Sequence, residues 1–374
     1  MAKNHHKEAY DEGTLTKLDI FQAYAEAWLG IWSVTTKMKV TDLWIWDFFA
    51  GPGKSVIGQY GSPLRILKVI EGHESRITQN GIKIHVRFND KSKSKYRSLI
   101  CNVESYVQSS LALSALKSKG LFDVEYYNSD FGVLFKEVIP TFGKAPALMF
   151  LDQNGVKYIG NEYLLPLLKS RLTDFLYFVS ASYFARFSSQ PEFIKNVPFK
   201  WNPDKPFNFI HREVIGYVRA KIPQGSRMRV YPFSIKKGSR IYGLLFGASH
   251  VLAAEKFLEI AWKENRLNGE ANFDIDEDAD KRQDCLFEEF RTFTKIEKFA
   301  KDVEIAVRAL EVKNNHEAYY YAVNNGFLPR HITFILKNLK KSRVIDYEGN
   351  SPRVSYKEAY KFDPSKGLLL YKVK

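Results

Sequence analysis

Residues 43–55 constrain the fold of this chain more than any other stretch. They read Leu-Trp-Ile-Trp-Asp-Phe-Phe-Ala-Gly-Pro-Gly-Lys-Ser, so an apolar run ends at Asp47 and is followed by Gly51 and Gly53. The apolar run predicts a buried parallel strand, and the glycines let the backbone turn tightly and approach a ligand closely. A strand, a carboxylate and a Gly-rich turn in this order are typical of the nucleotide-type site that begins an open α/β sheet.

Four further apolar segments predict the rest of a parallel sheet, with helical patterns between them. An amphipathic helix over 14–33, capped by Thr14 or Thr16, precedes the first strand. The strand and helix patterns alternate about every 30–40 residues, which indicates crossover helices. A hairpin with a basic tip, over 228–247, is expected to close the sheet edge with two antiparallel strands. The expected further strands are 82–90, 122–128, 147–151 and 174–180.

Four successive strand ends each carry a carboxylate, namely Asp47, Asp90, Asp130 and Asp152. The carboxyl ends of the strands line the ligand crevice in such sheets. An acidic residue at the end of the second strand is placed to bind ribose hydroxyls, which is one interpretation of Asp90. The other is a helix N-cap, because a basic helical start follows it directly.

The Gly-rich turn favours S-adenosylmethionine over the commoner phosphate ligands. Gly53-Lys-Ser55 suggests a phosphate loop, but Phe48 stands where that loop needs a glycine, and no Gly-x-Gly-x-x-Gly is present. A carboxylate before the turn can instead hold the amino-acid group of S-adenosylmethionine or its bound water, with Asp90 on the ribose and Asp130 on the adenine amine. The residues expected to bind this cofactor are Asp47, Phe49, Ala50, Gly51, Gly53, Asp90, Asp130 and Asp152.

Composition favours a polyanionic partner. There are 56 Lys and Arg against 42 Asp and Glu, a formal charge of +14, and 15% of the residues are aromatic. Excess positive charge attracts nucleic acid, and exposed aromatic rings stack on unpaired bases. The alternative is that the rings are core residues and that the charge serves solubility.

Cysteine content and hydropathy indicate a cytoplasmic protein without a metal site. Cys101 and Cys285 are far apart and lack metal-ligand spacing, so neither a disulfide framework nor a zinc site is expected. No apolar run approaches the ~18 residues that span a bilayer, and the first residues have no apolar signal-peptide core. We therefore expect no membrane partner.

The chain divides by composition into two parts and a linker. Residues 1–268 are expected to form a Rossmann-like methyltransferase-type domain, with a Pro-rich and aromatic insertion, 183–228, beside the site. Residues 269–284 hold seven acidic residues against two basic ones, a net −5, and predict an acidic linker. Residues 285–374 predict a basic winged helix-turn-helix-like α+β domain, with a third helix from Pro329 and a hairpin over 344–356. A helical dimerisation module with a solvated basic face is the alternative.

Basic residues in both parts are expected to contact nucleic acid. The first group lies at the tip of the 228–247 hairpin, and the second lies on the third helix of the C-terminal domain and just after it. They are Lys236, Lys237, Arg240, Arg330, Lys337, Lys340, Lys341 and Arg343.

Several motifs along the chain together resemble the three-Cys-motif partner protein (TcmP) family. They lie at residues 5–21 (with His5-His-Lys and Asp11-Glu-Gly-Thr), 48–53, 150–155, 232–238, 269–276 and 326–330. The resemblance covers most of the chain and implies a class I methyltransferase-like fold that binds S-adenosylmethionine. It also implies a partner protein with three cysteines, of the iron–sulfur or radical-SAM-like kind, in DNA repair or in a mobile-element or defence context.

The loop after the fourth strand leaves the reaction open. Many relatives carry Asp-Pro-Phe-Gly there, where this chain has Asp152-Gln-Asn-Gly155. It has neither the Pro pair of enzymes that methylate exocyclic amines nor the Cys nucleophile of those that methylate cytosine C5. Asp152 and Asn154 are the candidate catalytic residues, as a weak base and a dipole that orient a hydroxyl or an amine.

The sequence thus predicts a methyltransferase-like protein that binds S-adenosylmethionine and acts on or with nucleic acid, with DNA favoured over RNA. One alternative is a non-catalytic nucleic-acid-binding module with a degenerate methyltransferase fold. A nuclease or an NTPase is the second alternative.

Overall fold

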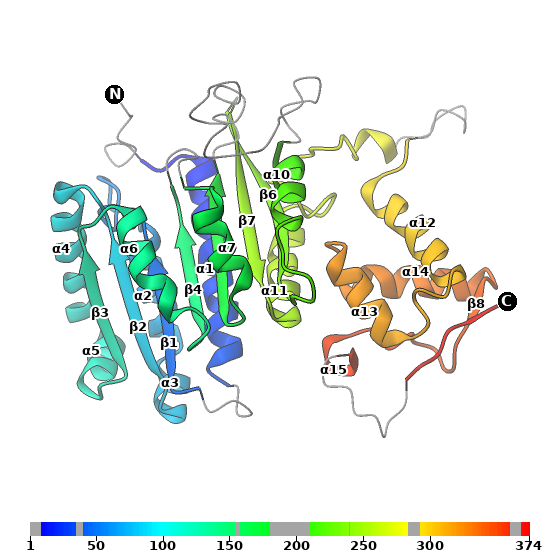
Figure 1. Cartoon of the computed structure of the whole chain (residues 1–374), viewed down its shortest axis with the longest axis horizontal. Coiled ribbons are helices and arrows are strands. Elements are labelled where there is room, and N and C mark those ends of the chain that lie inside the picture. The colour runs from blue at the N-terminus through cyan, green and yellow to red at the C-terminus, as the bar shows by residue number, and fades with distance from the viewer. Residues whose placement is uncertain are drawn as a thin grey trace. The chain divides into compact units, whose positions relative to one another are not determined.

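The computed structural model describes residues 9–34, 40–153, 158–179, 210–238, 240–282, 292–359 and 368–374 (Figure 1). The chain forms two compact units, Met1–Ala253 (unit 1) and Ala254–Lys374 (unit 2). The motif residues His5 and His6, the insertion residues 183–209 and Cys285 lie outside the described residues.

A seven-stranded sheet forms the centre of unit 1, in the order β3-β2-β1-β4-β5-β7-β6. The first five strands in this order pair in parallel, and β7 pairs antiparallel with both β5 and β6. This arrangement confirms the predicted Rossmann-like class I methyltransferase sheet with its antiparallel edge hairpin. The strands are β1 (Asp42–Asp47), β2 (Lys83–Asn89), β3 (Phe122–Tyr127), β4 (Ala147–Leu151), β5 (Thr173–Val179), β6 (Arg229–Lys237) and β7 (Arg240–Ala248).

Helices cover both faces of this sheet (Figure 1). Phe21 of α1 stacks on Phe150 of β4, with ring centres 3.9 Å apart, whereas Phe131 of α6 packs edge-on against Phe48 at 5.3 Å. The two contacts lie on opposite faces of the sheet. Phe150 pairs in register with Asp47, and Phe48 is the next residue along, where the side chain points to the other face. The helices of this unit are α1 (Glu12–Trp32), α2 (Ser62–Gly72), α3 (Glu74–Asn80), α4 (Lys93–Ser109), α5 (Leu111–Ser118), α6 (Phe131–Val138), α7 (Asn161–Lys169) and α10 (Ile210–Arg219), with a 3₁₀ turn at Ile139–Thr141.

Two local predictions for unit 1 need correction or extension. The first helix is capped by Asp11, whose carboxylate accepts the Thr14 N–H at 3.0 Å, and not by Thr14 or Thr16. Asp at the N-cap position satisfies the same free N–H groups that a threonine would. Within the predicted insertion, α10 packs on β6, and Arg219 donates to the Val230 carbonyl at 2.8 Å.

Unit 2 consists of helices followed by a small antiparallel sheet. The predicted third helix is confirmed as α14, which buries Ile332, Ile335, Leu336 and Leu339. The predicted hairpin strand around 354–356 is wrong, since β8 pairs with the C-terminal β9, and 356–359 form a short helix. The elements are α11 (Val251–Glu264, which begins in unit 1), a 3₁₀ turn (Asp280–Arg282), α12 (Lys295–Arg308), α13 (Asn315–Asn324), α14 (Pro329–Lys341), β8 (Ile345–Asp346), α15 (Tyr356–Ala359) and β9 (Lys372–Val373).

The acidic segment predicted as a linker is folded into unit 2 as far as the described residues reach. The Asp274 carboxylate accepts the backbone N–H groups of Asp278 and Ala279 at 2.9 and 2.8 Å. Asp278 is fully buried and accepts the Lys295 N–H at 2.9 Å, and Lys295 also pairs with Glu270 at 2.6 Å. These carboxylates cap backbone groups instead of facing solvent, so the boundary of the first unit lies before the predicted position 268.

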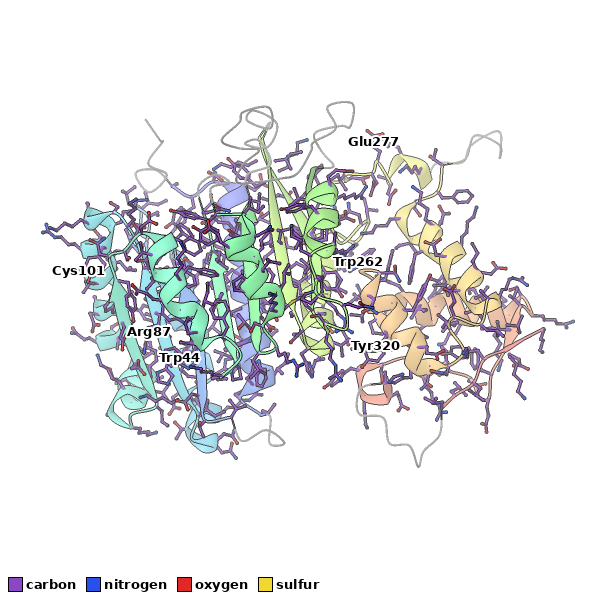
Figure 2. All side chains as sticks on the ribbon, viewed as in Figure 1. Trp44, Arg87, Cys101, Trp262, Glu277 and Tyr320 are labelled. Atoms are coloured by element: carbon purple, nitrogen blue, oxygen red, sulfur yellow. The ribbon has the colours of Figure 1, made fainter. Side chains whose placement is uncertain are left out.

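The structure also describes one of the two cysteines and the hydropathy of the helices. Cys101 is a free, exposed thiol on α4 (Figure 2). Within the described ranges, the helices are all too short or too polar to cross a membrane.

A buried carboxyl group should make the stability of unit 1 depend on pH. The Tyr24 hydroxyl donates to Asp174 at 2.7 Å, and burial raises the pKa of Asp174 to about 7 although this hydrogen bond lowers it. The folded pKa lies above the unfolded value of ~3.9, so stability falls as the pH rises from about 4 to about 7. Asp174→Asn should therefore gain about 2–3 kcal/mol relative to the wild type between pH 5 and pH 8. Chemical denaturation at both pH values measures this.

The matched control for this substitution is Glu137→Gln, at an exposed carboxylate of the same unit. It should follow the wild type at both pH values. An equal change for the two variants would mean that Asp174 is ionised in the folded protein.

Candidate functional site at the carboxyl edge of the sheet

The turn after β1 is shaped by a carboxylate that is wholly buried. Gly51 and Gly53 have φ angles of 63° and 86°, a region that favours glycine. The Ser62 hydroxyl donates to Asp47 at 2.6 Å, and the Phe49 N–H donates to its other oxygen at 3.1 Å. Burial raises the pKa of Asp47 to about 7, although these two hydrogen bonds lower it. Asp47 therefore holds the turn from inside.

Asp90 lies at the end of β2 and is oriented by two backbone donors. Its Oδ2 accepts the Gly51 N–H at 3.1 Å, and its Oδ1 accepts the Ser92 N–H at 2.7 Å. Ser92, not Asp90, is the N-cap residue of α4, so the N-cap interpretation of Asp90 is not realised. The carboxylate is half-buried at the junction of two loops, where a ligand can reach it.

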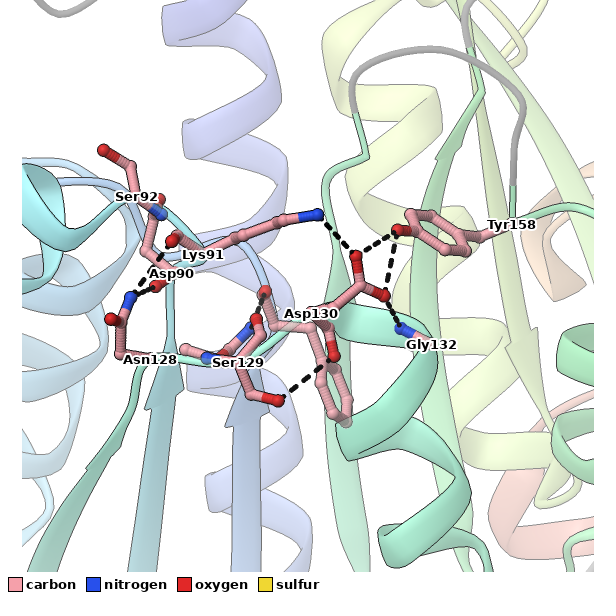
Figure 3. A network of polar contacts seen from close by, with 10 residues as sticks. Asp90, Lys91, Ser92, Asn128, Ser129, Asp130, Gly132 and Tyr158 are labelled. Carbon is pink, nitrogen blue, oxygen red and sulfur yellow. Dashed lines mark hydrogen bonds and ion pairs between the residues drawn. The ribbon is translucent and has the colours of Figure 1, made fainter.

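Asp130 follows β3 and is the N-cap residue of α6 (Figure 3). Its carboxylate accepts the Gly132 N–H at 2.9 Å and pairs with Lys91 at 2.8 Å. The Tyr158 hydroxyl lies 3.3 and 3.4 Å from its two oxygens. Asp130 thus joins the end of β3 to the loops after β2 and β4.

Asn89 connects the ends of the first three strands. Its side-chain NH₂ donates to the Phe48 carbonyl at 3.0 Å, and its side-chain oxygen accepts the Ser129 N–H at 3.0 Å. Asn128 donates to the Asp90 carbonyl at 2.7 Å (Figure 3). These amides fix the relative positions of the loops that carry Asp47, Asp90 and Asp130.

Asp152, the predicted catalytic carboxylate, forms an ion pair with Lys17 of α1. The next residue, Gln153, is buried, and its side-chain oxygen accepts the Tyr158 N–H at 3.0 Å. The second predicted catalytic residue, Asn154, lies outside the described residues.

The segment before α1 crosses the same edge of the sheet. The Tyr10 N–H donates to the Gln59 side chain at 2.7 Å, in the loop after β1. Asp11 pairs with Lys237 at 2.5 Å, at the end of β6. Because β6 runs parallel to β5, Lys237 lies at the carboxyl edge. Residues 10–17 thus contact the loops after β1 and β4 and the end of β6.

The basic residues predicted at the hairpin tip differ in their surroundings. Lys237 is held by Asp11, Lys236 is exposed on β6, and the side chain of Arg240 is outside the described ones. The other five predicted nucleic-acid contacts belong to unit 2. Of the described residues, no three or more His, Cys, Asp or Glu side chains gather as a metal site would require.

Four side chains that contact the predicted aspartates were missing from the sequence predictions: Lys17, Ser62, Lys91 and Tyr158. Ser62 had a recognisable position, as the first residue of α2 and directly before Pro63. Lys17 is a polar position of an amphipathic helix, and its partner is 135 residues away. No local pattern marks Tyr158 as a partner of Asp130.

The buried pair of Ser62 and Asp47 can be tested through stability. Ser62→Ala leaves Asp47 with one donor fewer, so it should destabilise unit 1 by about 1–3 kcal/mol at pH 8. The loss should be smaller at pH 6, because the lost hydrogen bond favours the ionised form and the pKa of Asp47 is about 7. Chemical denaturation at the two pH values measures the difference.

Ser75→Ala, at an exposed serine of α3, is the matched control and should change stability little. If Ser62→Ala behaves like this control, Asp47 does not depend on the hydroxyl.

The chain is similar to a solved structure but matches no protein-family model. No curated protein matches it either. Among solved structures, the chain is similar to Trm1 from Pyrococcus horikoshii, determined as a complex with S-adenosyl-L-methionine, with a TM-score of 0.39 and 12% identity. The alignment covers 67% of this chain and 59% of that one, so this chain matches less than two thirds of that protein's length.

Proposed function

We propose that this protein binds S-adenosylmethionine at the carboxyl edge of the sheet and transfers its methyl group to nucleic acid. The observation that carries the proposal is Asp90, a half-buried carboxylate at the end of β2 that two backbone N–H groups hold in place. A carboxylate offers about four lone-pair sites, so about two remain for a pair of vicinal hydroxyls. The end of the second strand is where open α/β sheets bind ribose.

The surroundings of Asp130 fit an adenine ring. Phe49 and Tyr158 are half-buried beside this carboxylate, with ring centres 6.2 Å apart, and both rings pack on the fully buried Phe131. Aromatic faces bind bases by stacking. Lys91, which pairs with Asp130, is 74% exposed, and an exposed ion pair contributes about 0–1 kcal/mol. An adenine amino group can therefore replace Lys91 at little cost.

The ion pair of Lys17 and Asp152 fits the amino-acid end of the cofactor. An α-amino acid group carries one positive and one negative charge, and these two side chains offer the complementary charges at the end of β4. Asp47 is not available for this role, because its carboxylate is fully buried and a ligand cannot reach it.

The chemistry divides between the cofactor and the chain. S-adenosylmethionine supplies a sulfonium methyl group, and transfer to an N–H or O–H nucleophile releases one proton. Asp152 is the described residue after β4 that can hold this proton, since Lys17 engages its Oδ2 and leaves Oδ1 without a hydrogen bond in the described part of the chain. The role of Asn154 stays a prediction.

Charge supports nucleic acid as the acceptor. Residues 1–253 contain 34 Lys and Arg against 21 Asp and Glu, or +13 of the total +14. Four of the basic residues, Lys91, Lys93, Lys95 and Arg97, follow Asp90 directly, where α4 begins. Such a field draws a polyanion toward this edge of the sheet. The partner protein with three cysteines stays a prediction of the family resemblance.

Calorimetry with S-adenosylmethionine tests the cofactor. The wild type should bind it, and Asp90→Ala should weaken binding at least about 30-fold, because hydrogen bonds to a charged acceptor contribute about 1.5–3 kcal/mol each. Circular dichroism checks that the variant is folded, and Glu137→Ala serves as the control at an exposed carboxylate. A wild type without affinity for S-adenosylmethionine would refute the proposal.

A second measurement separates catalysis from binding alone. The purified protein is incubated with methyl-labelled S-adenosylmethionine and either DNA or RNA. Label in the nucleic acid is the expected result, and Asp152→Asn should lose it even at a cofactor concentration that saturates this variant. Cofactor binding without transfer to either substrate would favour the non-catalytic module.

A further inference from the structure

Helices α13 and α14 form a helix-turn-helix. Residues 325–328 join them, a four-residue turn in which Gly326 has a φ angle of 81°. DNA-binding helix-turn-helix motifs join their helices by turns of this length, often with a glycine. The side of α14 that carries Ile332 and Leu336 is buried, which leaves its opposite side for a partner.

The exposed side of α14 carries basic, amide and aromatic side chains, the types that contact phosphates and base edges in complexes with nucleic acid. Arg330, Phe334, Lys337, Asn338 and Lys341 recur on it at spacings of three and four residues, and all are exposed. Phe334 is 64% exposed. The helix contains no Asp or Glu, and its Lys337 and Lys341 form no ion pair within the described residues.

Positive charge in unit 2 is concentrated in α14 and in the residues that follow it. Residues 329–374 contain eleven Lys and Arg against four Asp and Glu, or +7. Residues 254–282 contain five against nine, or −4. The C-terminal part of the unit's sequence is therefore strongly basic although the whole unit is almost neutral.

Lys340 has a different role from its basic neighbours. Its ammonium group donates to the carbonyls of Tyr347 and Gly349, the latter at 3.0 Å, and pairs with Asp346 at 3.2 Å. It thereby ties the turn after β8 to α14. An isolated antiparallel β-bridge pairs Asn314, before α13, with Leu370, which precedes β9. It extends the small sheet of β8 and β9 by one residue of a third chain segment. The order of these elements, from α12 to β9, is that of a winged helix-turn-helix.

We propose that unit 2 binds duplex DNA by placing the exposed side of α14 in the major groove. Lys337 and Lys341 contact phosphates, whereas Arg330, Phe334 and Asn338 face the base edges. Arginine pairs with guanine, asparagine with adenine, and an apolar side chain contacts the thymine methyl group. The major groove of B-form DNA admits a helix, whereas that of duplex RNA is too narrow. This function goes beyond methyl transfer and does not require the cofactor.

A second copy of the chain fits this surface less well than DNA. A two-fold interface on α14 would bring the like charges of Lys337 and Lys341 close to their own copies. Like-charge contacts at an interface cost affinity, and a polyanion removes that cost by neutralising the same groups.

Fluorescence anisotropy with the full chain and a DNA duplex of about 24 base pairs tests the surface. Lys337→Glu combined with Lys341→Glu should weaken binding at least about tenfold, and should lower the slope of log Kd against log salt by about 2. The matched control combines Lys298→Glu with Lys313→Glu, the same charge change at exposed lysines of unit 2 outside α14. This control should keep more of the affinity than the α14 variant.

Selection from a pool of randomised duplexes tests base reading. The wild type should enrich a preferred site, and Asn338→Ala should relax the preference at one position about 5- to 100-fold. Phe334→Ala should leave sedimentation of the protein unchanged. Tighter binding of duplex RNA or single strands, equal affinity of the α14 variant and the wild type, or an oligomer that Phe334→Ala dissociates would each overturn the proposal.

Calorimetry on the same α14 variant distinguishes this proposal from the methyl-transfer proposal. Affinity for S-adenosylmethionine should equal that of the wild type, because the cofactor residues belong to unit 1. Loss of both DNA and cofactor binding would show that the substitutions disturb the whole fold and would refute the assignment of DNA binding to α14.

Discussion

Buried polar groups hold the turn after β1, and the rest of the candidate site depends on them. Asp47 connects this turn to the start of α2 through Ser62, and Asn89 connects it to the loop after β3. Buried polar atoms without partners are costly, so the turn has few alternative conformations that satisfy the same groups. The N–H of Gly51 is thereby kept in place as a donor to Asp90. The buried side chains of Asp47 and Asn89 thus fix the turn, and this turn orients the more exposed Asp90.

This arrangement separates two carboxylates that look equivalent in the sequence. Asp47 and Asp90 both follow an apolar strand, and both were predicted to touch the cofactor. Asp47 is fully buried, and that burial raises its pKa to about 7. Asp90 is half-buried and held by backbone donors, which is the condition for orienting a ligand without a large desolvation cost. The difference depends on Ser62 and on the covering helices, which strand periodicity does not reveal.

Features set by local periodicity were predictable, and features set by distant contacts were not. The apolar alternation of strands and helices predicted the sheet, the strand-end positions of four aspartates, and the buried side of α14. The partners of those aspartates were missed, because Lys17 and Tyr158 meet Asp152 and Asp130 only in the folded chain. The small sheet of unit 2 was misassigned for the same reason: β8 pairs with the end of the chain, beyond the nearest apolar segment. The acidic segment resembled a linker because its charges, which bind backbone N–H groups and Lys295, carry no sign of burial in the sequence.

The two units differ in net charge, and we therefore expect them to interact with a polyanion in different ways. Unit 1 carries +13, and a net charge of this size produces a long-range field that attracts nucleic acid whatever its sequence. Unit 2 contains 22 basic and 21 acidic residues, so it adds almost nothing to that field. Its C-terminal residues 329–374 nevertheless carry +7, and α14 in this segment has three exposed basic side chains, Arg330, Lys337 and Lys341. A unit with almost no net charge contributes specificity through individual side chains more than affinity through a long-range field. This physical division supports attraction of the nucleic acid by unit 1 and reading of duplex DNA by α14 of unit 2.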